Sequence, residues 1–407
     1  MRTLTKQILL IITIIIFAST IYGSDKPYVI LISMDGFRWD YIYRGITPNL
    51  NKLKEEGVHA LSLRPSFPTK TFPNHYSIVT GMYPESHGII FNTFTNIFTG
   101  ETYRIGDTIS TRESKWYKGE AFWETANRHN IKTASFFWVG SEQNIDYKKP
   151  TYFYHYDSKI SFIDRVDGVI KWLQLPENER PQFITLYFEE PDSKGHSFGP
   201  EAPETNTAIA LVDSILGLLI DKLEKINMKD KVNIIIVSDH GMTEISEKRI
   251  VNIEEFLKGY NCKFYGMGTS IMIEPPQNKI DEVYQILKKN ENHFRVYTKE
   301  NIPGYYHFSK NPFILPIIAI ADIGWQLVTN DYFKRPRTYT LKGDHGFEKD
   351  HTDMHGIFIA KGPAFKSGYK TGTLWNVDIY PLLCKIFNIT PNNLIDGDIN
   401  RIEFILK

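Results

Sequence analysis

Short, strongly apolar runs alternate along the chain with segments of helical period. Four runs rich in β-branched residues are Tyr28–Met34, Phe183–Phe188, Val232–Val237 and Ile357–Ala360. Continuous apolar runs of this length are typical of central strands that are buried on both faces. Helical spacing covers Thr205–Ile226, and Leu50–Glu56 is a shorter helix that Gly57 can end. The alternation predicts an α/β fold with a mostly parallel central sheet and helices on both faces.

The pattern changes in the second half of the chain. Between residues 249 and 342 the predicted elements are shorter, and Pro, Tyr and polar residues are denser. We expect this stretch to be an inserted, smaller α+β subdomain that caps a catalytic core made of residues 25–248 and 343–407. No Pro/Ser-rich linker flanks the stretch, so the insert should pack on the core.

The first residues are typical of a secretory signal peptide. Arg2 and Lys6 precede an apolar run from Ile8 to Ala18, and small residues follow up to Ser24. The run is shorter than the roughly 20 residues that a membrane span needs. We therefore expect a signal peptide over residues 1–24 that is cleaved, and a periplasmic or secreted protein with no membrane span in its mature chain. An uncleaved N-terminal anchor is the alternative.

Composition and charge narrow the function. The 407 residues include 47 Lys and Arg and 47 Asp and Glu, so the formal charge is zero and no stable nucleic-acid partner is expected. Hydrophobic residues make up 42% and charged residues 23%, which is ordinary for globular proteins and excludes a disordered chain. Two cysteines, Cys262 and Cys384, are too few for a disulfide scaffold. Their residue types allow either a pair in an oxidising compartment or two buried thiols.

Acidic and imidazole side chains follow three of the predicted strands. Asp35 ends the first, Asp192 follows the second with His196 four residues later, and Asp239 and His240 follow the third. In open α/β sheets the functional crevice lies beyond the carboxyl ends of the strands. Any one Asp could simply cap the next helix. Three such strand ends with two histidines instead favour a divalent metal site, and mixed Asp and His ligands suit zinc.

The segment Pro68–Tyr76 contains a candidate nucleophile. Pro73 favours the first turn of a helix, which places Thr71 close to the N-cap. Free backbone N–H groups and the helix dipole favour a phosphate at that position, and a metal can activate a hydroxyl group there. The alternative is that Thr71 only caps the helix.

Together these segments resemble the nucleotide pyrophosphatase/phosphodiesterase family, the type I phosphodiesterases of the alkaline phosphatase superfamily. The motifs stand in order at the family's spacings, in residues 33–38, 69–75, 190–196 and 238–242, and the resemblance extends from about residue 27 to 397. The cysteine-rich N-terminal modules and the nuclease-like C-terminal domain of larger members are missing. The chain is therefore similar to a short, bacterial-type member that consists of the catalytic unit.

The resemblance implies two zinc ions per chain and a covalent threonyl intermediate on Thr71, which water then hydrolyses. One ion would be held by Asp192, His196 and His355, and the other by Asp35, Asp239, His240 and the Thr71 oxygen. His345 is the rival for the last place in the first set, because Gly343–Gly346 echoes the motif at residues 238–241. We prefer His355, since it directly precedes a predicted strand, where the family pattern places its ligand.

The resemblance also implies substrate contacts. Asn92 would hydrogen-bond a non-bridging phosphate oxygen, although it could be an ordinary turn residue. Phe72 and Tyr187 would stack on a nucleobase, with Tyr156 as a third candidate, and such stacking tolerates any base. The alternative is that these aromatic residues only pack in the core.

The predicted function is a secreted, monomeric two-zinc phosphodiesterase/pyrophosphatase that releases nucleoside 5′-monophosphates from small nucleotide substrates. One alternative is the same chemistry on a choline phospholipid head group. Another is a phosphate monoesterase, although Asn92 in the phosphate site speaks against it. A third is a binding module without activity, which the seven candidate ligand positions disfavour.

Overall fold

A computed structural model describes residues 27–334 and 341–407. The predicted signal peptide, residues 1–24, lies outside these ranges. The centre of the fold is an eight-stranded sheet with the order β19-β2-β18-β9-β1-β8-β6-β7. Strand β1 (Tyr28–Met34) pairs in parallel with β8 (Phe183–Phe188) and β9 (Val232–Val237).

The other strands of this sheet make it mixed but mostly parallel. Strand β18 (Phe358–Lys361) runs antiparallel to β9 and to β2 (Val58–Ala60). The remaining pairs, which involve β6 (Thr133–Phe136), β7 (Tyr152–Phe153) and β19 (Tyr369–Thr371), are parallel. The predicted α/β class is confirmed.

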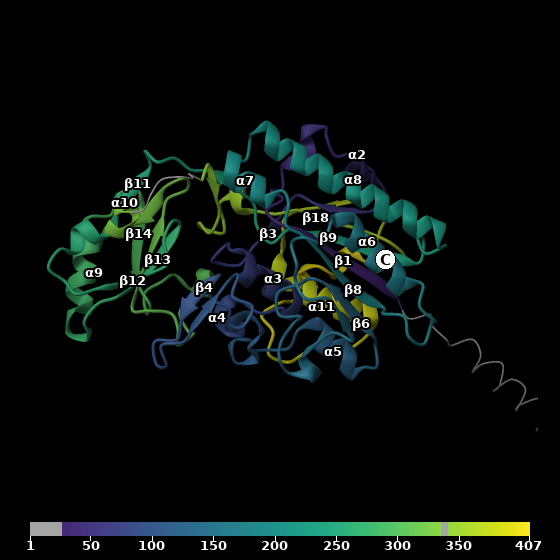
Figure 1. The fold of residues 1–407 in the computed structure, drawn as a ribbon, viewed down its shortest axis with the longest axis horizontal. Coiled ribbons are helices and arrows are strands. Elements are labelled where there is room, and N and C mark those ends of the chain that lie inside the picture. Colours follow the sequence, from purple (N-terminus) through teal and green to yellow (C-terminus); the bar gives the residue numbers. More distant parts are fainter. Residues whose placement is uncertain (1–26, 335–340) are drawn as a thin grey trace, which may run out of the picture.

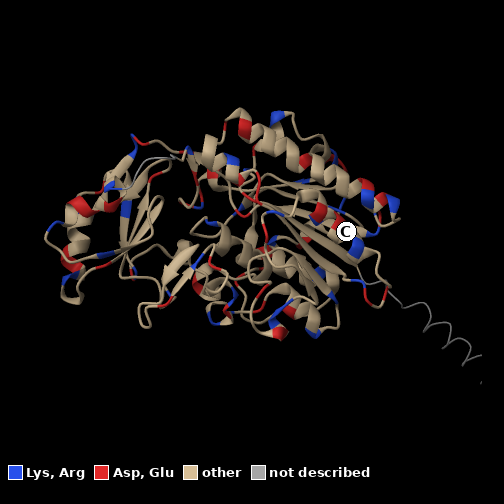
Figure 2. Cartoon of the chain, viewed as in Figure 1, with Lys and Arg blue, Asp and Glu red and all other residues tan. Residues whose placement is uncertain are grey.

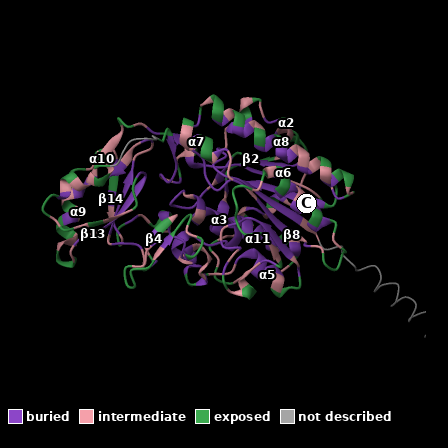
Figure 3. Ribbon diagram, viewed as in Figure 1, coloured by how far each residue is buried: buried purple, intermediate pink, exposed green. Residues whose placement is uncertain are grey.

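Helices cover both faces of the sheet (Figure 1). One face packs on α2 (Pro48–Glu56), α6 (Phe162–Leu173) and α8 (Pro203–Lys225), and the other on α3 (Thr71–Thr80), α5 (Phe122–Arg128) and α11 (Ile379–Phe387). Alternate residues of β1 divide between the two cores, since Ile30 and Ile32 join the first and Val29 and Leu31 the second. The central strands are accordingly buried except at Tyr28 and Tyr187, while the outer helices are buried along one side (Figure 3).

A second, antiparallel sheet lies within the predicted insert, at the left of Figure 1. Its order is β12 (Lys263–Tyr265), β13 (Ser270–Glu274), β15 (Ile317–Ala321) and β14 (Phe294–Thr298). Helix α9 (Ile280–Lys289) packs on it through Val283 and Leu287. These elements have the α+β composition expected of the insert, whose boundaries at 249 and 342 stay a prediction.

Short strand pairs lie on either side of the boundary between core and insert, and one carboxylate makes hydrogen bonds across it. Strand β10 (Thr243–Glu244) pairs with β17 (Gly343–Asp344), and β11 (Ile250–Asn252) pairs with β16 (Gln326–Val328). The Glu85 carboxylate accepts hydrogen bonds from the Ser309 and Lys310 amides of the insert, at 2.6 and 2.8 Å. The other short elements are β3 (Leu63–Arg64), α4 (Pro84–His87), β4 (Thr93–Thr95), β5 (Thr102–Arg104), α7 (Asp192–Phe198), α10 (Asn330–Lys334) and β20 (Leu374–Trp375).

The surface carries charges of both signs, intermixed along α8 and the insert (Figure 2). Within residues 27–334 and 341–407, no helix is both long enough and apolar enough to cross a bilayer. Cys262 is half-buried and Cys384 is buried, and both are free thiols. The pairing that the sequence left open is therefore not formed.

Candidate active site

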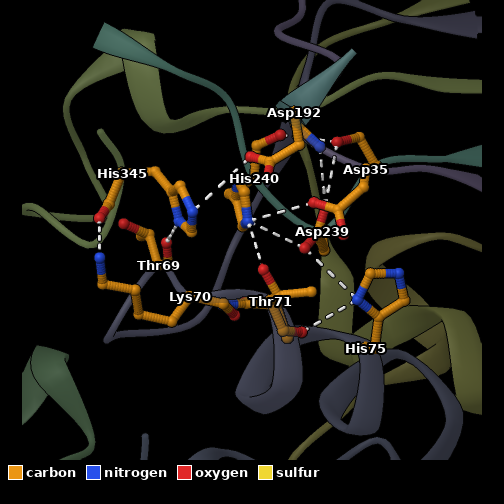
Figure 4. A network of polar contacts seen from close by, with 12 residues as sticks. Asp35, Thr69, Lys70, Thr71, His75, Asp192, Asp239, His240 and His345 are labelled. Atoms are coloured by element: carbon orange, nitrogen blue, oxygen red, sulfur yellow. Dashed lines mark hydrogen bonds and ion pairs between the residues drawn. The ribbon is translucent and has the colours of Figure 1, made fainter. Parts of the chain in front are cut away.

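The candidate catalytic residues meet where the central strands end. Asp35 directly follows β1, and Asp239 follows β9 after one serine. Asp192 begins α7, the helix that comes after β8, and its backbone amide bonds to the Asp35 carbonyl oxygen. Because β1, β8 and β9 run parallel, their carboxyl ends lie at one edge of the sheet, and the three carboxylates are brought together (Figure 4).

Each of these three carboxylates has an oxygen that lacks a hydrogen-bond partner. The atoms are Asp35 Oδ1, Asp192 Oδ1 and Asp239 Oδ2, and each is buried. A buried carboxylate oxygen without a partner is costly, and proteins tolerate it where a cation binds. The three oxygens therefore fit a metal centre.

Three histidines add imidazole nitrogens to the same place. His196, His240 and His345 each direct Nδ1 at a backbone carbonyl, at 2.9, 2.9 and 2.8 Å. A carbonyl only accepts, so each Nδ1 carries a proton and Nε2 is the nitrogen that can bind a metal, as is usual for histidines that bind one. Nε2 of His345 lies 3.1 Å from Nε2 of His196. Two facing lone pairs repel each other unless a cation lies between them.

The side chains divide into two neighbouring candidate metal sites. Ligand atoms of Asp192, His196 and His345 all lie within 4.8 Å of one another. On the other side, His240 Nε2 is 2.9 Å from Asp239 Oδ2 and 3.5 Å from Asp35 Oδ1. Asp192 also lies within the same limit of Asp35 and His240, so it stands between the two sites.

The electrostatics of the site favour bound cations. Burial raises the pKa of Asp35 well above its usual value, and the nearby carboxylates of Asp239 and Asp192 raise it further. Burial lowers the pKa of His345 well below its usual value, with added repulsion from His240 and Lys70. His345 is therefore neutral, the form in which imidazole binds a metal.

Thr71 lies at the edge of the second site. It is the first residue of α3, and its Oγ1 is 3.2 Å from His240 Nε2. The cap position of α3 is occupied by Lys70, and no side chain caps the helix. Asn92 lies beside it, since its Oδ1 accepts a hydrogen bond from the Phe72 amide at 2.9 Å. The structure thus brings the predicted nucleophile and the predicted phosphate contact together at the start of one helix.

His355 does not join this site, and the sequence-based choice of His355 over His345 is wrong in its geometry. His355 Nδ1 bonds to the Ser62 hydroxyl at 2.8 Å, and its Nε2 bonds to the Lys349 carbonyl at 3.1 Å. Both ring nitrogens are therefore occupied, and burial lowers the pKa of His355 to about 4. His345 takes the place beside Asp192 and His196.

His75 approaches the second site without a free nitrogen. Its Nδ1 lies 2.9 Å from the Thr71 carbonyl and 3.3 Å from Asp239 Oδ2, and its Nε2 lies 2.8 Å from the Ser33 hydroxyl. His75 therefore ties the start of α3 to Ser33 in β1. Sequence reasoning gave it no role, although its place four residues after Thr71 on one helix face was a usable signal.

Comparison with known proteins shows the family to which the chain belongs. The family model described as "Type I phosphodiesterase / nucleotide pyrophosphatase" matches residues 29–348. The chain belongs to this family. Human ectonucleotide pyrophosphatase/phosphodiesterase family member 1 is 37% identical over 396 residues, which are 93% of this chain and 42% of that protein. The chain thus spans less than half the length of the first curated relatives that it matches.

Solved structures of this family have the same fold. Human ectonucleotide pyrophosphatase/phosphodiesterase 5 aligns with a TM-score of 0.87 at 35% identity, covering 93% of this chain and all of that one. The murine counterpart has a TM-score of 0.87 at 33% identity over 94% of this chain and all of that one, and is described as an inactive threonine-to-alanine variant in complex with AMP. These relatives do not test the bacterial-type origin expected from the sequence.

Next to the metal residues, this family member has a cavity of about 370 Å³. Asp35, Thr71 and Asp192 line one end of it, and aromatic side chains line much of the rest: Phe72, Tyr117, Phe137, Trp138, Tyr156 and Tyr187. A cavity of this size with an aromatic lining suits a flat ring, and the metal residues at its end suit a phosphate.

The two predicted tyrosines differ in their surroundings. The Tyr187 hydroxyl donates to Asp35 Oδ2 at 2.7 Å, and its ring meets His75 edge-on at 5.2 Å between centroids. Tyr187 thus orients a candidate metal ligand from the inner end of the cavity. Tyr156 is 47% exposed and can offer a ring face to a ligand. Both tyrosines line the cavity with Phe72, and which of them stacks on a base stays a prediction.

Proposed function

We propose that this chain is a two-zinc phosphodiesterase/pyrophosphatase that hydrolyses nucleotides to nucleoside 5′-monophosphates. One observation carries the proposal. The Thr71 hydroxyl lies beside His240 in two adjoining sets of carboxylate and imidazole ligands, and Thr71, Asp35 and Asp192 also line an aromatic cavity. Family membership and the AMP complex of the murine relative support the same reading.

The first zinc ion would be held by Asp192, His196 and His345, and the second by Asp35, Asp239, His240 and Thr71. Nitrogen and oxygen ligands without a thiolate suit zinc in a catalytic site. Bound zinc would supply positive charge that lowers the pKa of the threonine hydroxyl and neutralises the phosphate oxygens. His75, bonded to the Thr71 carbonyl, keeps the start of α3 in place during this chemistry.

The reaction would proceed in two displacements at phosphorus. The Thr71 hydroxyl would lose its proton to water, and Oγ1 would form a bond to phosphorus while the bond from phosphorus to the leaving-group oxygen breaks and that group departs. Water then attacks the phosphothreonine ester, the bond from Oγ1 to phosphorus breaks, and a proton returns to Oγ1. The side-chain amide of Asn92 would donate to a non-bridging oxygen, since its Oδ1 already accepts from the Phe72 amide.

The aromatic cavity would bind the nucleoside part. Phe72 directly follows the nucleophile, and Tyr156 offers an exposed ring in the same cavity. Stacking on aromatic rings tolerates any base and contributes about 1–3 kcal/mol per base. A nucleotide with a phosphodiester or pyrophosphate bond would therefore place its base in the aromatic cavity and its phosphorus beside Thr71.

The test is the product pattern from ATP with zinc-loaded protein, followed by phosphorus NMR. AMP and pyrophosphate are expected, because attack at the α-phosphorus leaves the nucleoside part in the cavity. Thr71→Ala should keep its zinc and fold but lose nearly all turnover. ADP and phosphate, or no reaction, would overturn the proposal. Assays with phosphate monoesters and choline phospholipids would then identify the alternative activity.

A further inference from the structure

One carboxylate, that of Glu142, makes hydrogen bonds to two segments that line the aromatic cavity. Glu142 Oε1 accepts a hydrogen bond from the Tyr156 backbone amide at 2.7 Å. Its Oε2 lies 2.7 Å from His155 Nδ1 and accepts from Arg112 Nε at 3.0 Å. The Glu142 side chain is only 14% exposed, while the side chains of Arg112 and His155 are 34% and 59% exposed.

The partners of Glu142 come from two separate walls of the cavity. Arg112 belongs to the segment after β5, while His155 and Tyr156 follow β7. Glu142 lies between them in sequence, after β6, and Arg112, Glu142 and Tyr156 all line the cavity. The carboxylate therefore ties one wall to the other at the cavity itself.

The segment that carries Glu142 is anchored on both sides. Before it, the Trp138 indole donates to the His75 carbonyl in α3, the helix of the nucleophile, at 2.9 Å. After it, the Asn144 amide donates to the Arg112 carbonyl at 2.8 Å. Phe137, which meets the Tyr156 ring edge-on, has a backbone φ of 69°. A bulky residue adopts that left-handed conformation only where its surroundings enforce it, as they do at binding sites.

We propose that Glu142 is a positioning residue that fixes the segment of Tyr156 at the cavity. It would thereby favour substrates in which the ester group that stays on phosphorus carries a flat base. The inference rests on the proposed function and extends it to substrate specificity. Without the carboxylate, the Tyr156 amide loses its acceptor and the Arg112 guanidinium loses its partner beside the cavity. The wall then no longer presents its ring at a fixed distance from Phe72, while the metal residues at the other end of the cavity keep their contacts.

The test compares two substrates that share the p-nitrophenolate leaving group. In p-nitrophenyl thymidine 5′-monophosphate the retained group carries a base, and in methyl p-nitrophenyl phosphate it does not. Glu142→Ala should raise KM for the nucleotide about ten-fold with kcat within about two-fold, because the lost contribution is that of one positioned stack. The kcat/KM for the methyl ester and the zinc content should stay within about two-fold of wild type.

Two control variants complete the design. Glu142→Gln keeps an oxygen that can accept from the Tyr156 amide, so it should recover most of the nucleotide KM. Glu101→Ala removes a comparable carboxylate, which pairs with Lys115 at 2.6 Å and does not line the cavity. It should leave kcat and KM unchanged for both substrates.

The outcomes separate the two proposals. If Glu142→Ala lowers activity toward both substrates equally, or leaves the nucleotide KM unchanged, the positioning role is overturned. If the wild-type protein hydrolyses neither substrate, or prefers the methyl ester, the nucleotide function itself fails before any variant is compared.

Discussion

At the scale of single residues, the hydrogen bonds of each histidine decide its part in the site. A histidine can bind a metal through Nε2 only if that nitrogen is free of other partners. His345 meets this condition, because its Nδ1 donates to the Thr69 carbonyl. His355 does not, because the Ser62 hydroxyl and the Lys349 carbonyl occupy its two nitrogens.

Replacing each of these two histidines by alanine should therefore distinguish a role in metal binding from a role in packing. We expect His345→Ala to lose one zinc ion per chain under zinc-replete conditions, with affinity at that site reduced by more than about 100-fold. His355→Ala should keep two ions and lose about 1–3 kcal/mol of unfolding free energy, since a buried carbonyl loses its donor. Zinc content by elemental analysis and chemical denaturation measure both. Two ions in His345→Ala would contradict the assignment.

Strand-end chemistry could be predicted from the sequence, whereas the choice between the histidines could not. Asp35, Asp192 and Asp239 follow long apolar runs, and parallel strands bring their ends together whatever the loops do. His345 lies in a loop that returns from the insert, and its position depends on contacts with Thr69, far away in the sequence. Sequence proximity to a strand, the signal that favoured His355, carries no information about those contacts.

A second residue-scale prediction concerns acid stability. Burial lowers the pKa of His87 to about 3, and in an unfolded chain a histidine has a pKa of about 6.5. Below pH 6.5 the unfolded state therefore binds more protons, so stability is complete above that pH and falls as the pH drops toward 3. At pH 5 the loss from this one group is about 2 kcal/mol.

The measurement is the free energy of unfolding between pH 7.5 and 4.5. His87→Gln cannot take up a proton and should flatten the decline by about 2 kcal/mol at pH 5, whatever its effect at neutral pH. His129, an exposed histidine, provides the control, because His129→Gln should leave the slope unchanged. An unaltered slope in His87→Gln would show that this histidine does not stay neutral when folded.

At the scale of elements, the turn after β1 is shaped by the side chain that packs on it. Gly36 has a φ of 65°, and a Cβ atom there would lie 2.8 Å from Cβ and Oδ1 of Asp192. Gly45 has a φ of 75°, and a Cβ there would meet nothing within 4 Å. Both positions share the left-handed backbone, but only Gly36 lies against Asp192, and its amide also donates to Asp239 Oδ1 at 3.2 Å.

Replacing each glycine by alanine should distinguish the effect of backbone strain on stability from the effect of a displaced ligand on zinc affinity. Gly45→Ala is expected to cost about 1–2 kcal/mol of stability and leave zinc affinity unchanged. Gly36→Ala carries the same strain and also pushes Asp192 away, so its zinc affinity should fall by about 10–100-fold. Competition with a zinc-binding dye measures the affinity. Equal affinities in the two variants would show that Asp192 adjusts without loss.

The same scale shows which elements a sequence can specify. The residues of β1, β8 and β9 match the predicted runs because a long apolar stretch ends at a polar residue on each side. Strands β2, β7 and β19 have two or three residues each, too few to establish any period. They form because the neighbouring strand offers free backbone groups, a condition that is met only in the folded molecule.

At the scale of the whole molecule, the candidate metal site joins two segments of the core that the insert separates in the sequence. The Thr69 hydroxyl donates to the Phe347 carbonyl and accepts from the Gly346 amide, and Lys70 pairs with Asp344 at 3.1 Å. These contacts tie the segment before α3 to the segment that returns from the insert and carries His345. Zinc bound by Asp192, His196 and His345 would add a further link across this junction.

Chelation should therefore destabilise the molecule as a whole. Without cations, the buried oxygens of Asp35, Asp192 and Asp239 have no hydrogen-bond partner and their charges repel. A ligand that binds only the folded state stabilises it by about 4 kcal/mol at a concentration of 1,000 times Kd. We expect EDTA to lower the melting temperature by several degrees, zinc to restore it, and His345→Ala to show a smaller response because one site is already lost. A melting temperature that EDTA does not change would mean that the folded protein accommodates these buried carboxylates without bound metal.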